Sequence, residues 1–239
     1  MKTYSYGIDF FDDETLESEV EKIFTSLDRA IKSNPHKNIM DPFLAIFEAT
    51  YNKISIEEWL DMETSRQFNK TLSNAIGAFH QNLLGALPGW TSTGRSGGVI
   101  DIVHKEEFGV TGRPAIGEVK NKFNTLNASG KQTLYDNFQD ALKWNYKGYN
   151  CYLVEVIQKT PKPQHPWKVA NRGEREDIRL ISASEVYKIS TGDDQAFSKF
   201  FTAVNELLLK KYQLPSNEQA QRLFKRAFGS AGMPENATG

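Results

Sequence analysis

Two carboxylates and a lysine lie close together in the middle of the chain, within GGVIDIVHKEEFGVTGRPAIGEVKNK. Asp101 stands in a β-branched run that is typical of a strand, and Glu118 and Lys120 stand in the next such run. Because side chains alternate across a strand, Glu118 and Lys120 are expected to share one face while Val119 points to the other. If the two strands are neighbours, Asp101 lies beside Glu118.

This set of side chains suits the hydrolysis of a phosphodiester. Unpaired buried charges are costly, so two converging carboxylates are better explained as ligands of a hard cation than as core residues. Mg²⁺ takes one or two protein carboxylates together with phosphate oxygens, and a nearby lysine orients the attacking water or favours hydroxide. The spacing alone is a weak pattern, and an ion pair on a surface hairpin fits it equally well.

The chain that must position these residues is helical up to Trp90. Apolar residues recur there at helical spacing, and Asp41-Pro42 has the form of a helix cap followed by a first-turn proline. Asn34-Pro35 and Pro88-Gly89 are expected to end helices. The predicted helices span residues 12–33, 42–51, 55–69 and 72–87.

After Trp90 the sequence alternates between strands and helices. The run 152–157 is apolar throughout and is expected to be a central strand. Residues 91–98 are expected to form turns, 106–113 a loop, and 160–173, which contain three prolines, an extended loop. The predicted strands are residues 99–103, 115–122, 152–157 and 178–181. The predicted helical segments are 129–146 (capped by Asn127 or Ser129), 183–187, 195–212 and 219–228, with a frayed tail after Gly229.

Asp101 followed by Glu118-Val119-Lys120 resembles the signature of the PD-(D/E)XK nucleases. Further segments resemble type II restriction endonucleases that cut GGNCC or GGWCC sites, over residues 75–150: Gly117 to Thr125, Phe79-His80-Gln81 and Pro88-Gly89-Trp90. The resemblance implies Mg²⁺ as cofactor and a homodimer that cuts double-stranded DNA at a short GC-rich palindrome and leaves 5′-phosphates. It also implies an α/β fold, with a mixed central sheet of about five strands flanked by helices.

Carried over residue by residue, the resemblance makes Asp101 and Glu118 the metal ligands and Lys120 the catalytic lysine. Many of these nucleases also place a glutamate on the helix before the aspartate strand, whereas this helix offers Gln81 beside His80. A glutamine carbonyl orients a metal-bound water without adding charge. Gln81 is therefore the catalytic candidate at this position and His80 the alternative. The proline of the signature is also replaced, by Ile100.

We expect a single nuclease domain over residues 1–239. Its parts would be a helical region over residues 1–74, a catalytic α/β core over 75–190 and carboxy-terminal helices over 191–239.

Two polar segments are candidates for DNA contact. Lys122 and Asn124 follow the catalytic strand and could contact phosphates or base edges, unless they only form the loop before a capped helix. Arg172 and Arg175 lie in a basic loop and could read guanine through O6 and N7 in the major groove. The acidic residues among them fit a solvated charged turn equally well.

The composition is ordinary for a globular protein, with 39% hydrophobic and 25% charged residues among 239. The net charge of −1 gives no overall signature of a nucleic-acid binder, although the amino end is acidic and residues 199–228 are basic. No apolar run is long enough to span a bilayer, and the single cysteine, Cys151, fits a reducing compartment. We therefore expect a cytoplasmic protein without a membrane partner.

Several other catalytic motifs are missing from the sequence. His36, His104, His165 and Cys151 lack zinc-ligand spacing, and there is no complete phosphate-binding loop and no Gly-x-Ser-x-Gly elbow. Two alternatives to a restriction enzyme stay open: a repair or mobile-element nuclease with the same centre, and a non-catalytic DNA-binding module of the same fold. A restriction enzyme would need a cognate DNA methyltransferase in the same system, though not as a physical partner.

Overall fold

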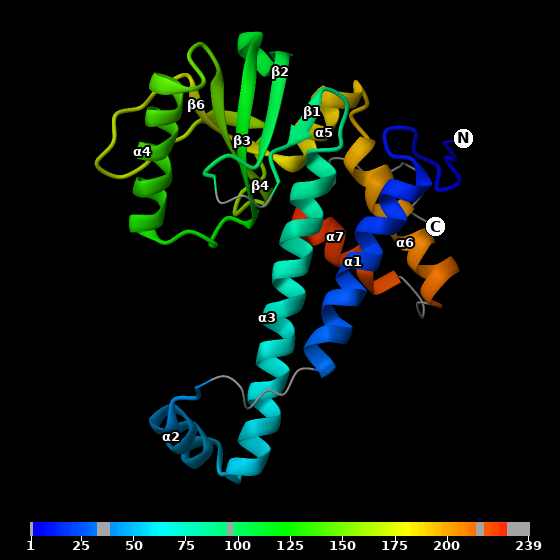
Figure 1. The fold of residues 1–239 in the computed structure, drawn as a ribbon, viewed down its shortest axis with the longest axis vertical. Coiled ribbons are helices and arrows are strands. Elements are labelled where there is room, and N and C mark those ends of the chain that lie inside the picture. Colours follow the sequence, from blue (N-terminus) through cyan, green and yellow to red (C-terminus); the bar gives the residue numbers. More distant parts are fainter. Residues whose placement is uncertain (1, 33–38, 95–97, 214–217, 229–239) are drawn as a thin grey trace. The chain divides into compact units, whose positions relative to one another are not determined.

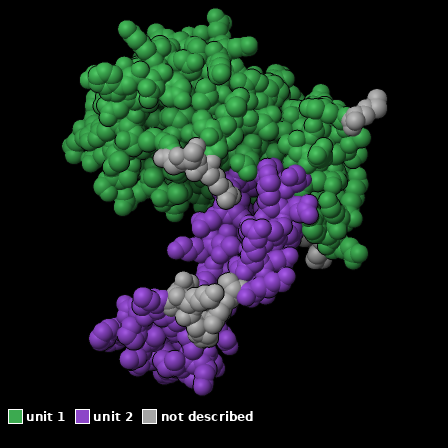
Figure 2. All heavy atoms as spheres, viewed as in Figure 1, with its two compact units in different colours: residues 1–17, 80–239 green, residues 18–79 purple. Residues whose placement is uncertain are grey.

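The chain forms two compact units, which Figure 2 shows in different colours. The computed structural model describes residues 2–32, 39–94, 98–213 and 218–228. The first unit consists of residues 1–17 with 80–239, and the second of residues 18–79. The boundaries fall within two helices, α1 (Asp13–Lys32) and α3 (Ile56–Leu84).

A mixed sheet forms the centre of the first unit (Figure 1). Within the described residues it has six strands in the order β1-β2-β3-β4-β6-β5. β3 and β6 both run parallel to β4, and the other neighbouring pairs are antiparallel. The strands are β1 (Trp90–Ser92), β2 (Ile102–Phe108), β3 (Arg113–Lys122), β4 (Asn150–Ile157), β5 (Gln164–Pro166) and β6 (Ile178–Ser182). The mixed α/β fold predicted from the sequence is confirmed, with one strand more than the expected five or so.

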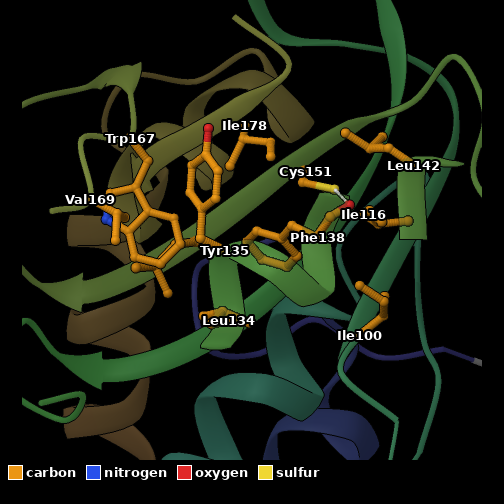
Figure 3. Packing of buried hydrophobic residues seen from close by; sticks show 11 residues of the cluster. Ile100, Ile116, Leu134, Tyr135, Phe138, Leu142, Cys151, Trp167, Val169 and Ile178 are labelled. Carbon is orange, nitrogen blue, oxygen red and sulfur yellow. Dashed lines mark hydrogen bonds between the residues drawn. The ribbon is translucent and has the colours of Figure 1, made fainter. Parts of the chain in front are cut away.

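Helix α4 (Ala128–Trp144) covers one face of this sheet. It begins at Asn127, whose Oδ1 accepts a hydrogen bond from the backbone N–H of Gly130 at 2.7 Å, so the cap is Asn127 rather than Ser129. The predicted apolar stripe of the helix is buried, and it forms one core with residues of the sheet (Figure 3). This core includes Leu134, Tyr135, Phe138 and Leu142 of α4 and Ile116, Cys151, Leu153 and Ile178 of the strands.

Aromatic residues and further helices cover the opposite face of the sheet. Tyr152 alternates with the core residues of β4 and packs edge-on against Phe108, with ring centroids 5.7 Å apart. Nε1 of Trp90 donates to the hydroxyl of Ser190 at 3.0 Å, which ties β1 to helix α5 (Ala183–Thr191). Helices α6 (Ala196–Tyr212) and α7 (Glu218–Phe228) follow, and the Phe197 ring of α6 stacks on that of Phe224 at 5.9 Å.

Helix α2 (Pro42–Asn52) lies in the second unit and begins as the sequence predicted. Asp41 caps it, accepting at Oδ1 from the backbone N–H of Phe43 at 2.9 Å, and Pro42 stands in its first turn. Ala45 and Ala49 pack against the buried Trp59 of α3. Of the described helices, none has the length and apolarity that a membrane span requires.

Two predictions about helices are corrected. Residues 56–84 form the single helix α3, so the prediction of separate helices over 55–69 and 72–87 is wrong. No proline or glycine occurs between the two predicted segments, so nothing interrupts the helical hydrogen bonds. The turn predicted over 183–187 continues to Thr191 and ends at Gly192, which takes the left-handed conformation. The predicted stop at Asn34-Pro35 and the tail after Gly229 lie outside the described residues.

The strand boundaries also differ from the prediction. The strand predicted over 99–103 runs from 102 to 108, so part of the predicted loop 106–113 belongs to β2. The rest of that loop is a short 3₁₀ helix, η2 (Gly109–Thr111), and β3 begins at Arg113. The predicted turns over 91–98 include the last two residues of β1, and the predicted loop over 160–173 contains β5. Three-residue strands are too short to show an alternating pattern in the sequence.

Candidate active site

The pairing of β2 with β3 brings the predicted metal ligands together. The strands are antiparallel, with Ile102 opposite Gly117. Asp101 precedes β2 by one residue, but its backbone continues the ladder on both sides. Its N–H donates to the C=O of Gly117 at 2.9 Å, and its C=O accepts from the N–H of Thr93 at 2.9 Å. The backbone of Asp101 is therefore fixed between β1 and β3.

Both carboxylate oxygens of Asp101 are held by hydrogen bonds. Oδ2 accepts from the backbone N–H of Val119 at 2.8 Å, and Oδ1 accepts from Nε2 of Gln81 at 2.7 Å. Gln81 lies in the last turn of α3, so the side chain predicted at the helix position contacts the aspartate directly. Each carboxylate oxygen has a second lone pair, which leaves both oxygens able to ligate a cation.

Glu118 and Lys120 form an ion pair, which places them on one face of β3 as the alternation predicted. Nζ of Lys120 lies 2.5 Å from Oε1 of Glu118, and the Glu118 side chain is only 14% exposed. The other oxygen, Oε2, is buried without a hydrogen-bond partner in the described part of the chain. Burial and the nearby charge of Asp101 raise the pKa of Glu118 to about 7, against the lowering effect of Lys120. The ion pair with Lys120 therefore does not fully offset the burial of the Glu118 carboxylate.

The donor set fits a divalent cation such as Mg²⁺. A buried carboxylate is costly unless it is paired or coordinates a metal, and Oε2 of Glu118 offers an acceptor that no donor occupies in the described part of the chain. Over the described ranges, no group of three or more His, Cys, Asp or Glu side chains gathers to hold a metal. Asp101 and Glu118 would therefore supply two protein ligands, and water and phosphate oxygens would complete the coordination, as Mg²⁺ commonly allows.

A third carboxylate, Glu155, lies near the site and was not predicted. In the parallel pairing of β3 with β4, its Cα is opposite that of Lys120. The residue is 6% exposed, and burial raises the pKa of its carboxyl while the positive charge of Lys131 on α4 lowers it. The sequence held a signal for this residue, because Glu155 is the sole charge in the strand NCYLVEVI.

His80 was the alternative to Gln81 at the helix position. Burial lowers the pKa of His80 to about 4, so its imidazole is neutral near pH 7. The hydrogen bond that reaches Asp101 from this helix comes from Gln81. The geometry therefore favours Gln81 as the residue that acts with the aspartate.

Lys122 and Asn124, the predicted DNA contacts after the catalytic strand, both face solvent. Lys122 is the last residue of β3, and by alternation it shares the face of Lys120. Its C=O accepts from the hydroxyl of Thr125 at 2.7 Å, which fixes the turn that presents Asn124. Both side chains are available to a ligand that approaches the carboxylates from this end of the strand.

The two arginines predicted to read bases are engaged in bidentate ion pairs. Arg172 donates from Nε and Nη2 to Asp136 of α4 at 2.5 and 2.6 Å. Arg175 donates from Nε and Nη2 to Asp177 at 2.8 and 2.7 Å. A guanidinium held in this way presents its paired donors to a guanine only after the carboxylate releases them. Their described hydrogen bonds go to Asp136, Asp177 and the C=O of Asn171, and not to the candidate centre.

Helix α4 fixes the same loop by two further bonds. Nε2 of Gln132 donates to the C=O of Ala170 at 3.0 Å. The hydroxyl of Tyr135 donates to the C=O of Gly173, while its ring is fully buried in the core. These bonds attach the loop between β5 and β6 to α4.

His104 and Cys151, two of the residues that lacked zinc-ligand spacing, are held by contacts within the protein core. Nδ1 of His104 lies 3.1 Å from the C=O of Glu106, and its ring packs against Trp90. Cys151 is buried, and its thiol contacts the C=O of Phe138 (Figure 3). His36 lies outside the described residues.

The chain resembles known proteins over most of its length. The family model described as Eco47II restriction endonuclease matches residues 8–212. The chain belongs to this family. It is 29% identical over 244 residues to the type II restriction enzyme Eco47II of Escherichia coli, covering 93% of this chain and 99% of that enzyme. It is 26% identical over 207 residues to the type II restriction enzyme Sau96I of Staphylococcus aureus, covering 80% of this chain and 76% of that enzyme.

Membership in the Eco47II family confirms the predicted enzyme class, a type II restriction endonuclease. The matched residues include Gln81, Asp101, Glu118 and Lys120, and they end before α7. The four side chains that the structure brings together therefore lie inside the segment that defines the family.

Proposed function

We propose that this restriction enzyme hydrolyses double-stranded DNA through a magnesium centre of the PD-(D/E)XK type, formed by Asp101, Glu118 and Lys120. The observation that carries the proposal is the buried oxygen of Glu118, which has no described hydrogen-bond partner and lies close enough to the Asp101 carboxylate for its charge to raise the Glu118 pKa. A cation held by both carboxylates would offset this repulsion.

Each side chain has a distinct part in the proposed reaction. Asp101 and Glu118 would hold Mg²⁺, which when bound polarises the scissile phosphate and neutralises charge on its oxygens. The ammonium of Lys120 orients the attacking water from its position beside Glu118. The amide N–H of Gln81 donates to Asp101, which leaves its carbonyl oxygen to accept a hydrogen bond from the same water.

Glu155 is proposed as a positioning residue. Its Cα lies in register with that of Lys120, and its charge interacts with Lys131 of α4. A negative charge at this point offsets the repulsion between the two ammonium groups and holds Lys120 close to the carboxylates. Glu155 acts through Lys120, without a contact of its own to the scissile phosphate.

The proposed substrate is a short GC-rich palindrome of the GGNCC or GGWCC kind, cut to leave 5′-phosphates. Lys122 and Asn124 would contact the backbone beside the cut. Arg172 and Arg175 would exchange their aspartate partners for DNA when the complex forms. The proposed enzyme is a single nuclease that acts in the cytoplasm, where a methyltransferase of the same system would protect the host DNA.

A palindrome is read by two copies of a protein related by a two-fold axis, since each copy reads one half-site. We therefore propose that the active form is a homodimer with one centre of Asp101, Glu118 and Lys120 facing each DNA strand.

Digestion of a sequenced plasmid in the presence of Mg²⁺ tests this function, with the ends of the fragments mapped to the base. Discrete fragments that end at one palindrome with 5′-phosphates are expected. A smear would indicate a nuclease with looser sequence preference, as in repair or mobile elements. Retention of DNA without cleavage at any concentration of Mg²⁺ or Mn²⁺ would indicate a non-catalytic binding module.

A further inference from the structure

Helix α2, which Figure 1 labels in the second unit, has apolar residues on two opposite faces. Ala45 and Ala49 form the inner face, which packs against Trp59. At 3.6 residues per turn, Phe47 projects directly away from the midpoint of these two alanines. Phe43 and Tyr51 lie one turn before and after Phe47, so the three rings form a row along the outer face.

The outer row faces solvent in the free chain. Phe43, Phe47 and Tyr51 are 71%, 73% and 87% exposed, and Leu44 and Ile46 beside them are more than half exposed. A helix that is apolar all round is normally buried on all sides. The face therefore has the composition of an interface, and it is open to a partner.

The chemistry of this face selects among partners. Glu48 is the only charged residue of α2, and it is bound on the inner side to Nε1 of Trp59 at 2.9 Å and to Arg66. A face without cations does not suit DNA, whose backbone requires lysine or arginine. An interfacial membrane helix carries a polar face rich in basic residues opposite its apolar face, whereas the opposite face of α2 is a protein core. An uncharged apolar face suits another protein.

The same face of α2 on a second copy of this chain fits the outer row in shape and in area. A row at positions i, i+4 and i+8 is the ridge by which two helices commonly interdigitate, and it can pair with itself about a two-fold axis without repulsion between like charges. With about 200 Å² for each aromatic side chain, the exposed row and its neighbours offer about 600 Å² of apolar surface. A standard interface buries about 800 Å² per partner, about two-thirds of it apolar in homodimers.

We propose that the outer face of α2 is the contact through which two copies of this chain form a dimer, with Phe47 near the two-fold axis. The inference rests on the proposed function in one respect, because cutting both strands of a palindrome requires two centres. It goes further because it names the helix and the residues through which the two copies of the chain would be joined.

Sedimentation of the full chain over a range of concentrations tests the proposal. The wild-type chain is expected to form a dimer, and Phe47→Glu is expected to raise the dissociation constant by at least about 100-fold, because each dimer loses two buried phenylalanines. Val110→Glu is the matched control, since Val110 is 70% exposed in η2 of the other unit. A wild-type chain that stays monomeric overturns the proposal, and so does a dimer that Phe47→Glu leaves intact.

Cross-linking provides a second measurement that does not depend on the fold of a charged variant. The chain has a single cysteine, Cys151, and it is buried, so a cysteine introduced on the surface is the reactive one. Phe47→Cys is expected to give a covalent dimer on mild oxidation, whereas Val110→Cys is expected to stay monomeric. Equal cross-linking of the two variants would contradict the assignment.

These outcomes separate the inference from the proposed function. Neither sedimentation nor cross-linking requires cleavage, so a dimer joined at Phe47 that does not cut DNA would defeat the function alone. Site-specific cutting by an enzyme whose Phe47→Cys variant does not cross-link would defeat the inference alone. Flotation of the wild-type chain with lipid vesicles, lost in Phe47→Glu without a change in mass, would assign the face to a membrane and overturn the dimer.

Discussion

At the scale of single residues, Glu118 carries a cost in the free protein that a metal ion would offset. Its buried oxygen has no described hydrogen-bond partner, and its pKa is raised to about 7, mainly by burial. A group of this kind destabilises the fold above the pH at which it would ionise in the unfolded chain. Residues of this kind are typical of functional sites, where stability is given up for activity.

The variant Glu118→Gln is expected to raise the free energy of unfolding at pH 8 without Mg²⁺, because it removes a buried negative charge. Saturating Mg²⁺ is expected to raise the melting temperature of the wild-type protein by about 5 °C or more, because the ion binds only the folded state, and to have little effect on the variant. Thermal unfolding with and without Mg²⁺ measures both effects.

Glu107→Gln is the control for this measurement, since Glu107 is an exposed glutamate of β2. It should behave as the wild type does in both conditions. Equal responses of the wild type and Glu118→Gln to Mg²⁺ would mean that Glu118 is not a ligand.

Glu155→Gln tests the proposed positioning role. The substitution keeps the volume and removes the charge beside Lys120, so single-turnover cleavage is expected to slow by about 10- to 100-fold, as for other residues that orient a catalytic group. DNA binding should hold or improve, since a negative charge near phosphates is lost. Cleavage and binding measured on the same DNA give the comparison, and equal losses in both would indicate a purely structural residue.

The sequence predicted the central part of the site because its signal is local. Residues at positions i and i+2 of a strand share one face. For this reason the prediction that Glu118 and Lys120 lie on the same face was correct. Glu155 was missed because it lies far along the chain, and only the register of β3 with β4 brings it beside Lys120. The ion pairs of Arg172 and Arg175 depend on side-chain geometry that the sequence does not show.

At the scale of elements, the site depends on the turn that joins α3 to β1. Gly89 takes a φ of +81° there, and a Cβ at this residue would lie 2.2 Å from Nε2 of His104. The His104 ring is held between Trp90 and Phe108, at centroid distances of 5.2 and 5.3 Å, so it has little room to move. This close approach fixes the end of the helix that carries Gln81 against β2.

Gly89→Ala is expected to destabilise the protein more than Gly7→Ala, which provides a matched control. Gly7 has a similar φ of +72°, but a Cβ added there would meet nothing within 4 Å, so its substitution costs only the backbone strain of about 1–2 kcal/mol. The contact with His104 should add about 1–3 kcal/mol. Chemical denaturation measures the difference, and equal losses would show that the close approach has no energetic consequence.

The elements were predictable where their patterns are long. Helices α1, α4 and α6 and the central strand β4 were found from periodicity and apolar runs. The break expected within α3 was wrong because the sequence between the two predicted helices contains no helix breaker. Strands β1 and β5 were missed because a strand of three residues is too short to show an alternating pattern. The start of β2 was placed too early because Val99 and Ile100 share the β-branched composition of the strand.

At the scale of the whole molecule, each chain offers one proposed catalytic centre in its described residues. A cut through both strands of DNA needs two such centres. A dimer joined through α2 would place two centres on one DNA molecule. The number of strands cut in one encounter therefore reports the assembly directly.

Wild-type enzyme is expected to convert a supercoiled plasmid with one site to linear DNA with little nicked circle. The monomeric Phe47→Glu variant is expected to accumulate nicked circles, because one centre cuts one strand at each encounter. Val110→Glu should behave as the wild type. A gel time course shows the three plasmid forms, and linearisation by Phe47→Glu without nicked circles would contradict a dimer that depends on α2.

The most direct test of the account is cleavage by Asp101→Asn and Glu118→Gln in Mg²⁺, measured beside a thermal unfolding curve for each variant. Both variants remove a charge while keeping the size of the side chain. We predict that both unfold cooperatively and that cleavage falls by at least about 1,000-fold, because the charge that would hold the cation is lost. A folded variant that cuts DNA at a rate near that of the wild type would contradict the proposed magnesium centre.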